Sequence, residues 1–287
     1  MTSGSIWKQM TFFAMPIFLG NLFQQLYNTV DSLIVGNFLG SSALAAVSSS
    51  GSLIFMLIGF LSGISAGAGV IVARFFGAGD EKNLQRAVHT TVAFGLVAGV
   101  LMTGVGVALS PQILRWMDTP ESVMRESVTY LQIYFAGSLG FVMYNVLVGI
   151  LQAVGDSRHP LYYLIVSSVI NLVLDLLFIT GFHTGVGGAA VATVISQIVS
   201  ALLCFWQLLR TKESYGLKIR KIRFDKGILV QIIKIGLPSG VQNSIIAFAN
   251  VIVQSNINAF GEMAMAGYGA YTKVEGYMDP LGNMMMI

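Results

Sequence analysis

The chain has 287 residues, of which 55% are hydrophobic and only 10% are charged. Soluble domains carry about 25% charged residues, so this composition excludes an ordinary soluble protein and predicts an integral membrane protein. The net charge of +3 does not indicate a nucleic-acid partner, because the basic residues lie between apolar spans and form no patch with aromatic residues. The single cysteine, Cys204, excludes an internal disulfide.

The first apolar span covers residues 11–38 and carries a polar stripe. Four polar side chains follow at steps of three, four and three and so share one helix face: Asn21, Gln24, Asn28 and Asp31. We expect this face to meet protein or water and not lipid. Pro16 predicts a bend near the start of the span, because proline cannot complete the backbone hydrogen-bond ladder.

Five further apolar spans are each long enough to cross a bilayer: 44–73, 88–109, 123–154, 161–182 and 186–209. Basic residues collect on one side of this arrangement, at Lys8 and in the connections 74–86, 155–160 and 210–226, whereas only Arg115 and Arg125 lie on the other. The positive-inside rule therefore predicts a multi-pass protein of the cell membrane with its N-terminus in the cytoplasm.

The fifth span contains an unusual segment, residues 167–180, with the sequence SSVINLVLDLLFIT. Asn171 and Asp175 lie four residues apart, so both side chains point to the same helix face. An aspartate near the middle of a membrane helix costs about 2.5 to 3.5 kcal/mol, so such a group usually faces a cavity, a partner or an ion path. A polar pair packed between two helices is the alternative interpretation.

Two intramembrane carboxylates, Asp31 and Asp175, indicate ion handling. We expect them to share a proton or a monovalent cation. The sixth span has a polar edge suited to the same pocket, formed by Thr193, Ser196, Gln197 and Ser200. Ordinary helix packing is the alternative for these residues, because small polar side chains are frequent between membrane helices.

The polar connection 210–226 is the best internal boundary, since the pattern of the first span recurs after it. Pro16 corresponds to Pro238, 222 residues later, and at an offset of 221 three further residues (Asn37, Ala43, Ala45) correspond to Asn258, Ala264 and Ala266. Such a repeat predicts two similar bundles with the substrate path between them. Only two helices of the second copy fit before residue 287, so we expect a truncated sequence that lacks about four helices.

Several motifs together resemble one known family. They are PIFLG followed by NLFQQLYNTVDSLIVG, the loops ARFFGAGDEKNLQRAV and LQAVGDSRHP, and GVGGAAVATVISQ at the start of the sixth span. This pattern is similar to the multidrug and toxic compound extrusion (MATE) family of cation-coupled efflux transporters, in its DinF-like branch. The resemblance implies two six-helix lobes around a V-shaped cleft, and export of mostly cationic, amphipathic drugs in exchange for protons or sodium.

The same resemblance implies roles for particular residues. Asp31, Asn171, Asp175 and Thr193 match the cation-site positions of the first lobe, and Pro16 matches a proline whose bend is tied to substrate release, which suggests a gating hinge. Asp31 corresponds to Ile252 or Val253 in the second copy, so the ion chemistry belongs to the first copy.

These expectations combine into one interpretation: an all-α integral membrane fold of three parts. Residues 1–209 form a six-helix lobe, 210–226 a basic cytoplasmic linker, and 227–287 the first two helices of an incomplete second lobe. The expected partners are a small-molecule substrate, the lipid bilayer and a missing second-lobe segment, with no nucleic acid. The coupling ion is H+ or Na+, and no cofactor or metal site is expected.

Other classes fit the sequence less well. No GxxxxGK(S/T) sequence occurs, which argues against a built-in ATPase, and no catalytic signature accompanies the carboxylates as an intramembrane protease would require. We therefore expect no enzyme activity. The nearer alternative is a flippase or an exporter of lipid-linked or other metabolites with the same two-lobe plan, which a cavity rich in basic residues would favour.

Some residues keep no assigned role at this level. Lys273, Glu275 and Asp279 lie in the last span without an assignable partner. Five aromatic and methionine residues could line a drug cavity, but at helical spacing ordinary packing is the favoured interpretation: Phe23, Tyr27, Tyr134, Met143 and Tyr144.

Overall fold

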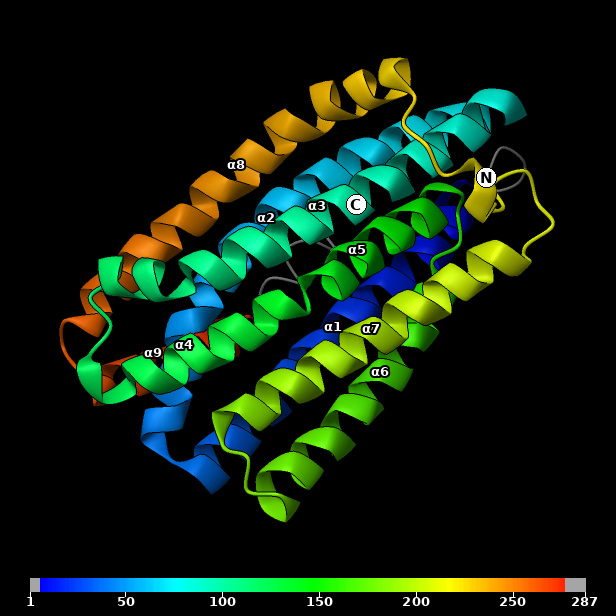
Figure 1. Ribbon diagram of the computed structural model, residues 1–287. Helices are drawn as coiled ribbons and strands as arrows, with labels where there is room; N and C mark the ends of the chain where they lie inside the picture. The colour runs from blue at the N-terminus through cyan, green and yellow to red at the C-terminus, as the bar shows by residue number, and fades with distance from the viewer. Residues whose placement is uncertain (1–5, 277–287) are drawn as a thin grey trace.

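A computed structural model describes residues 6–276, and over this range the chain forms a bundle of long helices (Figure 1). Asp279 lies outside the described residues. The helices are α1 (Ile6–Leu39), α2 (Ser41–Gly77), α3 (Glu81–Trp116), α4 (Glu121–Ala136), α5 (Ser138–Ala153), α6 (Arg158–Leu176), α7 (Val186–Arg210), α8 (Lys226–Asn258) and α9 (Glu262–Glu275). A π-helical turn, Leu177–Gly181, extends α6, and a 3-10 turn, Ile219–Lys221, lies between α7 and α8.

Within the described range, five helical stretches are long and apolar enough to cross a membrane: Gly59–Gly77, Glu81–Trp116, Arg158–Gly181, Val186–Arg210 and Lys226–Asn258. The pair α4 and α5 is long and apolar enough only when both helices are taken together, and it is bent by 50°, as in a broken span or a re-entrant loop. These findings confirm a multi-pass helical membrane protein. The first predicted span corresponds to α1, which is long enough to cross but is not among these stretches, because its amides and Asp31 lower its mean hydropathy.

The bend between α4 and α5 has a packing reason. The predicted span 123–154 is a single segment in sequence, yet the helix breaks at Gly137. A Cβ atom on Gly137 would lie less than 3.0 Å from the side chain of Val194, so only glycine lets α7 approach this closely. The helix therefore changes direction where a neighbouring helix presses against it.

The predicted repeat has a counterpart in the backbone. Gly40 precedes α2 with φ 89° and ψ −176°, and Gly261 precedes α9 with φ 89° and ψ −179°. These two glycines are separated by the repeat offset of 221 residues and share a conformation that other residues rarely adopt. The two helix starts also meet, because Ser41 Oγ donates a hydrogen bond of 3.3 Å to Glu262 Oε1.

Both repeat prolines lie inside long helices. α1 continues as one helix through Pro16, and α8 continues through Pro238. The bend that the sequence predicts at Pro16 thus does not interrupt α1.

The two larger of three apolar clusters among the described residues form most of the core, one toward each end of the bundle. The first joins α2, α3, α5, α7 and α8 through residues such as Val72, Leu84 and Leu147. The second joins α1, α2, α4 and α7 through residues such as Val35 and Leu131. α1 and α6 lie side by side along the bundle (Figure 1).

The segment between α7 and α8, residues 211–225, is held against α3 and not left free. His89 of α3 is 3% exposed, and its Nε2 accepts a hydrogen bond of 3.0 Å from the backbone N–H of Lys218. The other ring nitrogen, Nδ1, lies 2.5 Å from the carbonyl oxygen of Gln85, which requires that Nδ1 carries the proton. Leu217, 3% exposed, anchors the same segment in the first apolar cluster.

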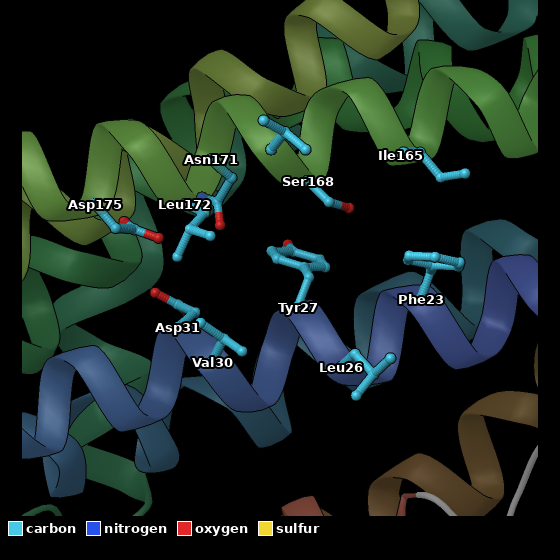
Figure 2. A pocket seen from close by; sticks show the side chains of 11 residues that line it. Phe23, Leu26, Tyr27, Val30, Asp31, Ile165, Ser168, Asn171, Leu172 and Asp175 are labelled. Atoms are coloured by element: carbon cyan, nitrogen blue, oxygen red, sulfur yellow. The ribbon is translucent and has the colours of Figure 1, made fainter.

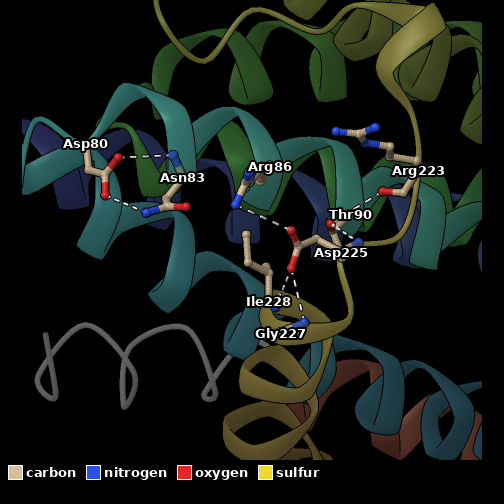
Figure 3. Close-up of polar contacts among 8 residues, drawn as sticks. All are labelled: Asp80, Asn83, Arg86, Thr90, Arg223, Asp225, Gly227 and Ile228. Carbon is tan, nitrogen blue, oxygen red and sulfur yellow. Dashed lines mark hydrogen bonds and ion pairs between the residues drawn. The ribbon is translucent and has the colours of Figure 1, made fainter.

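Polar contacts also fix the start of α8 (Figure 3). The Thr90 hydroxyl accepts a hydrogen bond of 3.1 Å from the Asp225 N–H. The Asp225 carboxylate accepts from the N–H groups of Gly227 and Ile228 and so caps α8. It also lies 3.8 Å from the Arg86 guanidinium.

At the start of α3, the Asp80 carboxylate accepts hydrogen bonds from the backbone N–H and the side-chain amide of Asn83 (Figure 3). These hydrogen bonds favour the ionised form and hold the pKa of Asp80 below its usual range. The connection between α2 and α3 is therefore capped by a carboxylate that stays ionised.

Replacing His89 by alanine is expected to release the segment 211–225. The variant removes the ring nitrogen that accepts from the backbone N–H of Lys218, and the loss of this hydrogen bond costs about 0.5–1.5 kcal/mol. Limited digestion with trypsin should then cut this segment about tenfold faster. His159→Ala is the control, because the His159 side chain is 44% exposed and its ring pairs with Asp156 and not with the segment 211–225. Equal cleavage rates in the two variants would contradict the assignment.

Candidate functional site

A cavity of about 170 Å³ lies between α1 and α6. Asp31 from α1 and Asp175 from α6 point toward one another across it, and Asn171 lies one turn before Asp175 (Figure 2). The remaining lining is mostly apolar: Phe23, Leu26, Tyr27, Val30, Ile165, Ser168, Val169 and Leu172. The structure thus brings together three of the four residues that the sequence assigns to a cation site.

The polar atoms of this cluster are buried but not satisfied. Asn171 is 1% exposed and Asp175 is fully buried. Four side-chain atoms of the cluster have no hydrogen-bond partner among the described residues: Asn171 Nδ2, Asp31 Oδ1, Asp175 Oδ1 and Asp175 Oδ2. Buried polar groups in native proteins nearly always have partners, since leaving one unpaired is costly. The cluster is therefore suited to hold a positive charge.

The carboxyl groups of Asp31 and Asp175 face each other across the cavity (Figure 2). Two ionised carboxylates repel one another, but a single proton would convert the pair into a donor and an acceptor. A monovalent cation between the oxygens would relieve the same repulsion. Asp31 and Asp175 could therefore bind either a proton or a monovalent cation at the same position between them.

Thr193 is not among the residues that line this cavity. It lies on α7, is 6% exposed, and its hydroxyl donates a hydrogen bond of 3.0 Å to the carbonyl oxygen of Ala189. Ser196 likewise donates to the carbonyl of Thr193, at 2.8 Å. Both hydroxyl protons are used within α7, which fits the packing interpretation better than a direct role. A ligand role for Thr193 stays a prediction.

Two aromatic residues that the sequence analysis interprets as packing do line the cavity. Tyr27 precedes Asp31 by four residues and Phe23 precedes it by eight, so all three share one face of α1. Gln197 of α7 lies near the Tyr27 hydroxyl and is 8% exposed. The spacing relative to Asp31 is the signal that could have found Phe23 and Tyr27.

The polar stripe of α1 divides between two cavities. A second cavity, of about 630 Å³, lies between α1, α2, α5 and α6, and its lining includes Pro16, Asn21 and Gln24. Fifteen residues separate Pro16 from Asp31, which is about 22 Å along a helix. Pro16 therefore lies outside the carboxylate site, and its role as a gating hinge stays a prediction.

A structural metal centre has no basis among the described residues. No group of three or more His, Cys, Asp or Glu side chains in residues 6–276 has a geometry that could hold a metal ion. The carboxylate site thus combines two acidic side chains and one amide.

A bundle of long apolar helices with a buried cluster of two carboxylates and an amide defines a multi-pass membrane protein with polar groups inside its helical bundle. The family model named MatE matches residues 16–177, and the chain belongs to this family. The sequence is 34% identical over 282 residues to the probable multidrug resistance protein YoeA of Bacillus subtilis, which covers 96% of this chain and 61% of the relative. It is 25% identical over 266 residues to the multidrug export protein MepA of Staphylococcus saprophyticus, covering 92% and 59%.

Solved structures agree with the family. An inward-facing multidrug resistance MATE family transporter of the MOP superfamily superimposes with a TM-score of 0.83 at 28% identity, covering 91% of this chain and 60% of that one. A MATE crystal structure in the bent conformation superimposes with a TM-score of 0.79 at 25% identity, covering 99% and 69%. The chain thus spans about three fifths of the length of the curated relatives that it matches.

Proposed function

We propose that this protein is a cation-coupled antiporter of the cell membrane and not an enzyme. It exports drugs or other amphipathic, mostly cationic small molecules in exchange for H+ or Na+. The observation that carries the proposal is the cluster of Asp31, Asn171 and Asp175, whose buried polar atoms lack partners. The names of the relatives, which include multidrug resistance and multidrug export proteins, support the substrate class.

The coupling follows from competition for negative charge. Binding of a proton or a monovalent cation at Asp31 and Asp175 removes negative charge from the cavity, which weakens a cationic substrate bound nearby. The same event changes the polar contacts of α1, which carries Asp31. Exchange requires that the ligand has different affinities for the outward-facing and inward-facing states, since a ligand shifts an equilibrium only by that difference.

We further propose a two-lobe plan of six plus six helices, within the DinF-like branch. The matched glycine conformations at Gly40 and Gly261 support the repeat that this plan requires. Basic residues at one end of the bundle support a cytoplasmic N-terminus: they include Lys8, Arg74, Arg86, Arg158 and Arg210. Pro16 as a hinge and Thr193 as a further ligand belong to the same proposal.

A flippase for lipid-linked metabolites would use basic residues to hold an anionic headgroup. Neither the cavity beside Asp31 and Asp175 nor the larger cavity beside Pro16 has a lysine or an arginine among its lining residues. No observation therefore favours this alternative.

The test is transport by the full-length protein in lipid vesicles. With a proton or a sodium gradient imposed across the membrane, we expect ethidium to move against its own gradient, in the direction opposite to the ion. Protein-free vesicles give the leak rate. Vesicles that contain folded protein but move ethidium only at the leak rate, under both gradients, would contradict the proposal.

A further inference from the structure

The connection between α7 and α8 contains the sequence KIRKIRF at residues 218–224, which we call the KIRKIRF segment. Four basic residues are interleaved with three apolar residues in it, and it has no acidic residue. One residue, Ile222, packs against the first apolar cluster. The other six are exposed: Lys218, Ile219, Arg220, Lys221, Arg223 and Phe224. The segment therefore rests on the bundle through one side and presents its positive charges on the other.

The backbone of the KIRKIRF segment is fixed by α3 at two points. At its start, the Lys218 N–H donates a hydrogen bond of 3.0 Å to His89 Nε2. Near its end, the Arg223 carbonyl accepts a hydrogen bond of 3.4 Å from the Thr90 hydroxyl (Figure 3). The 3-10 turn Ile219–Lys221 lies between these two contacts. The basic side chains thus extend from a backbone of defined position.

The positive charge of the segment is not used within the described part of the protein. No ion pair among residues 6–276 includes any of its four basic residues. The carboxylate that follows the segment, Asp225, lies 3.8 Å from the Arg86 guanidinium and caps α8. Basic residues outnumber acidic residues by seven to two over residues 210–226. The surface is therefore suited to bind an anion from outside the chain.

The position of the segment indicates where that anion comes from. α7 and α8, the two helices that it joins, are both long and apolar enough to cross a membrane. Near the end of α7, Trp206 is 49% exposed and the Arg210 guanidinium lies 4.2 Å from the centre of its ring. Exposed tryptophans are frequent where a membrane meets water, and arginines near helix ends reach the lipid headgroups. The KIRKIRF segment thus lies at the level of the headgroups.

We propose that the KIRKIRF segment is a binding site for anionic phospholipids of the membrane that the protein spans. Its four basic side chains hold the phosphate groups, because lysines and arginines beside a membrane helix attract anionic headgroups. Ile219 and Phe224, which are 60% and 47% exposed, insert among the upper parts of the acyl chains. An acidic polypeptide would match the charges but would leave these two apolar side chains unexplained.

The test measures which lipids stay bound to the full-length protein. The protein is solubilised from vesicles of equal parts phosphatidylglycerol and phosphatidylcholine, and its bound lipids are identified by native mass spectrometry. We expect a preference for phosphatidylglycerol. Glutamine at all four basic positions of the segment should reduce this preference about fivefold. Exchanging lysine for arginine and arginine for lysine at the same positions should preserve it, because the charge is kept.

A matched control removes the same number of charges at the same end of the bundle but outside the segment. It carries glutamine in place of two exposed arginines and two exposed lysines: Arg74, Lys82, Arg158 and Lys212. We expect this control to keep its preference for phosphatidylglycerol. The double variant Ile219→Ser, Phe224→Ser should lose about half of it. If the fourfold neutral variant does not fold, Arg220→Gln and Lys221→Gln are measured singly, and each should reduce the preference about twofold.

Glycerol 3-phosphate, which offers a phosphate without acyl chains, should not displace the lipid at the concentration at which phosphatidylglycerol binds. Displacement would mean that the surface takes a free phosphate and would overturn the proposal. Equal losses in the control and in the segment variants would overturn it as well. No preference in the unsubstituted protein would also contradict it and would leave an acidic polypeptide as the occupant. None of these measurements involves transport, so the proposed function stands or falls separately.

Discussion

Replacing Asp175 by asparagine should reduce gradient-driven export of ethidium to the leak rate. The substitution keeps the size of the side chain but removes the charge that competes for a proton or a cation in the cavity. Asp175 is fully buried and both of its carboxylate oxygens lack partners, so its negative charge has no other described use in the protein. The neutral amide is also cheaper to bury, and the amount of folded protein in the membrane should not fall.

The measurement is ethidium transport in vesicles, normalised to the amount of folded protein. Asp118→Asn is the matched control, because Asp118 lies in the connection between α3 and α4, where its φ of 50° suits asparagine as well as aspartate. We expect the control to transport at the unsubstituted rate. Undiminished gradient-driven export by Asp175→Asn would show that the carboxylate does not couple the ion to the substrate.

The central residues of the carboxylate site were predictable, because placing a carboxylate in an apolar membrane helix has a high free-energy cost. A carboxylate in an apolar helix is expensive wherever the helix packs, so Asp31 and Asp175 stand out from the sequence alone. Asn171 follows from Asp175 by helical spacing. Helix periodicity also predicts that Asp31 faces protein, and the cavity between α1 and α6 agrees with this.

Other parts of the site depend on packing that a linear pattern does not contain. Tyr27 and Phe23 have the same spacing as ordinary core aromatics, and only the position of α6 decides that they line a cavity. A threonine hydroxyl can coordinate an ion or donate a hydrogen bond to a backbone carbonyl of its own helix. The Thr193 hydroxyl donates to the carbonyl of Ala189. Gln25 of α1 reaches the backbone carbonyl of Lys273 only because α9, more than 200 residues later in the chain, packs against α1.

The same division holds for the fold. Apolar span lengths predicted the helices, and the repeat offset of 221 residues also relates Gly40 to Gly261, which the structure shows in the same conformation. The break at Gly137 was not predictable, because glycine is frequent within membrane helices. It depends on the close approach of the Val194 side chain of α7, which the sequence pattern does not contain.

Replacing Gly63 by alanine should destabilise the protein by several kcal/mol, because α2 and α8 cross there with their backbones in contact. The two helices lie side by side (Figure 1). A Cβ atom on Gly63 would lie less than 3.0 Å from backbone atoms of Gly240, and one on Gly67 would meet Gly236 in the same way. Small residues four apart on both helices are the usual means of such close approach in membranes.

Backbone atoms of a packed helix cannot move aside as a flexible side chain can, so Gly63→Ala must push α2 and α8 apart and lose contacts along the crossing. Gly104→Ala is the control: Gly104 lies inside α3 and its added Cβ would meet nothing within 4 Å, so alanine should be neutral or slightly stabilising there. In thermal unfolding in detergent, Gly63→Ala should therefore lower the midpoint, whereas Gly104→Ala should leave it unchanged or raise it slightly. An equal shift would mean that α2 and α8 are not held together through their glycines.

The same substitution, Gly63→Ala, should also lower transport per folded molecule. α8 follows the polar segment 211–225 and begins the second copy of the repeat, so its contact with α2 joins the two copies.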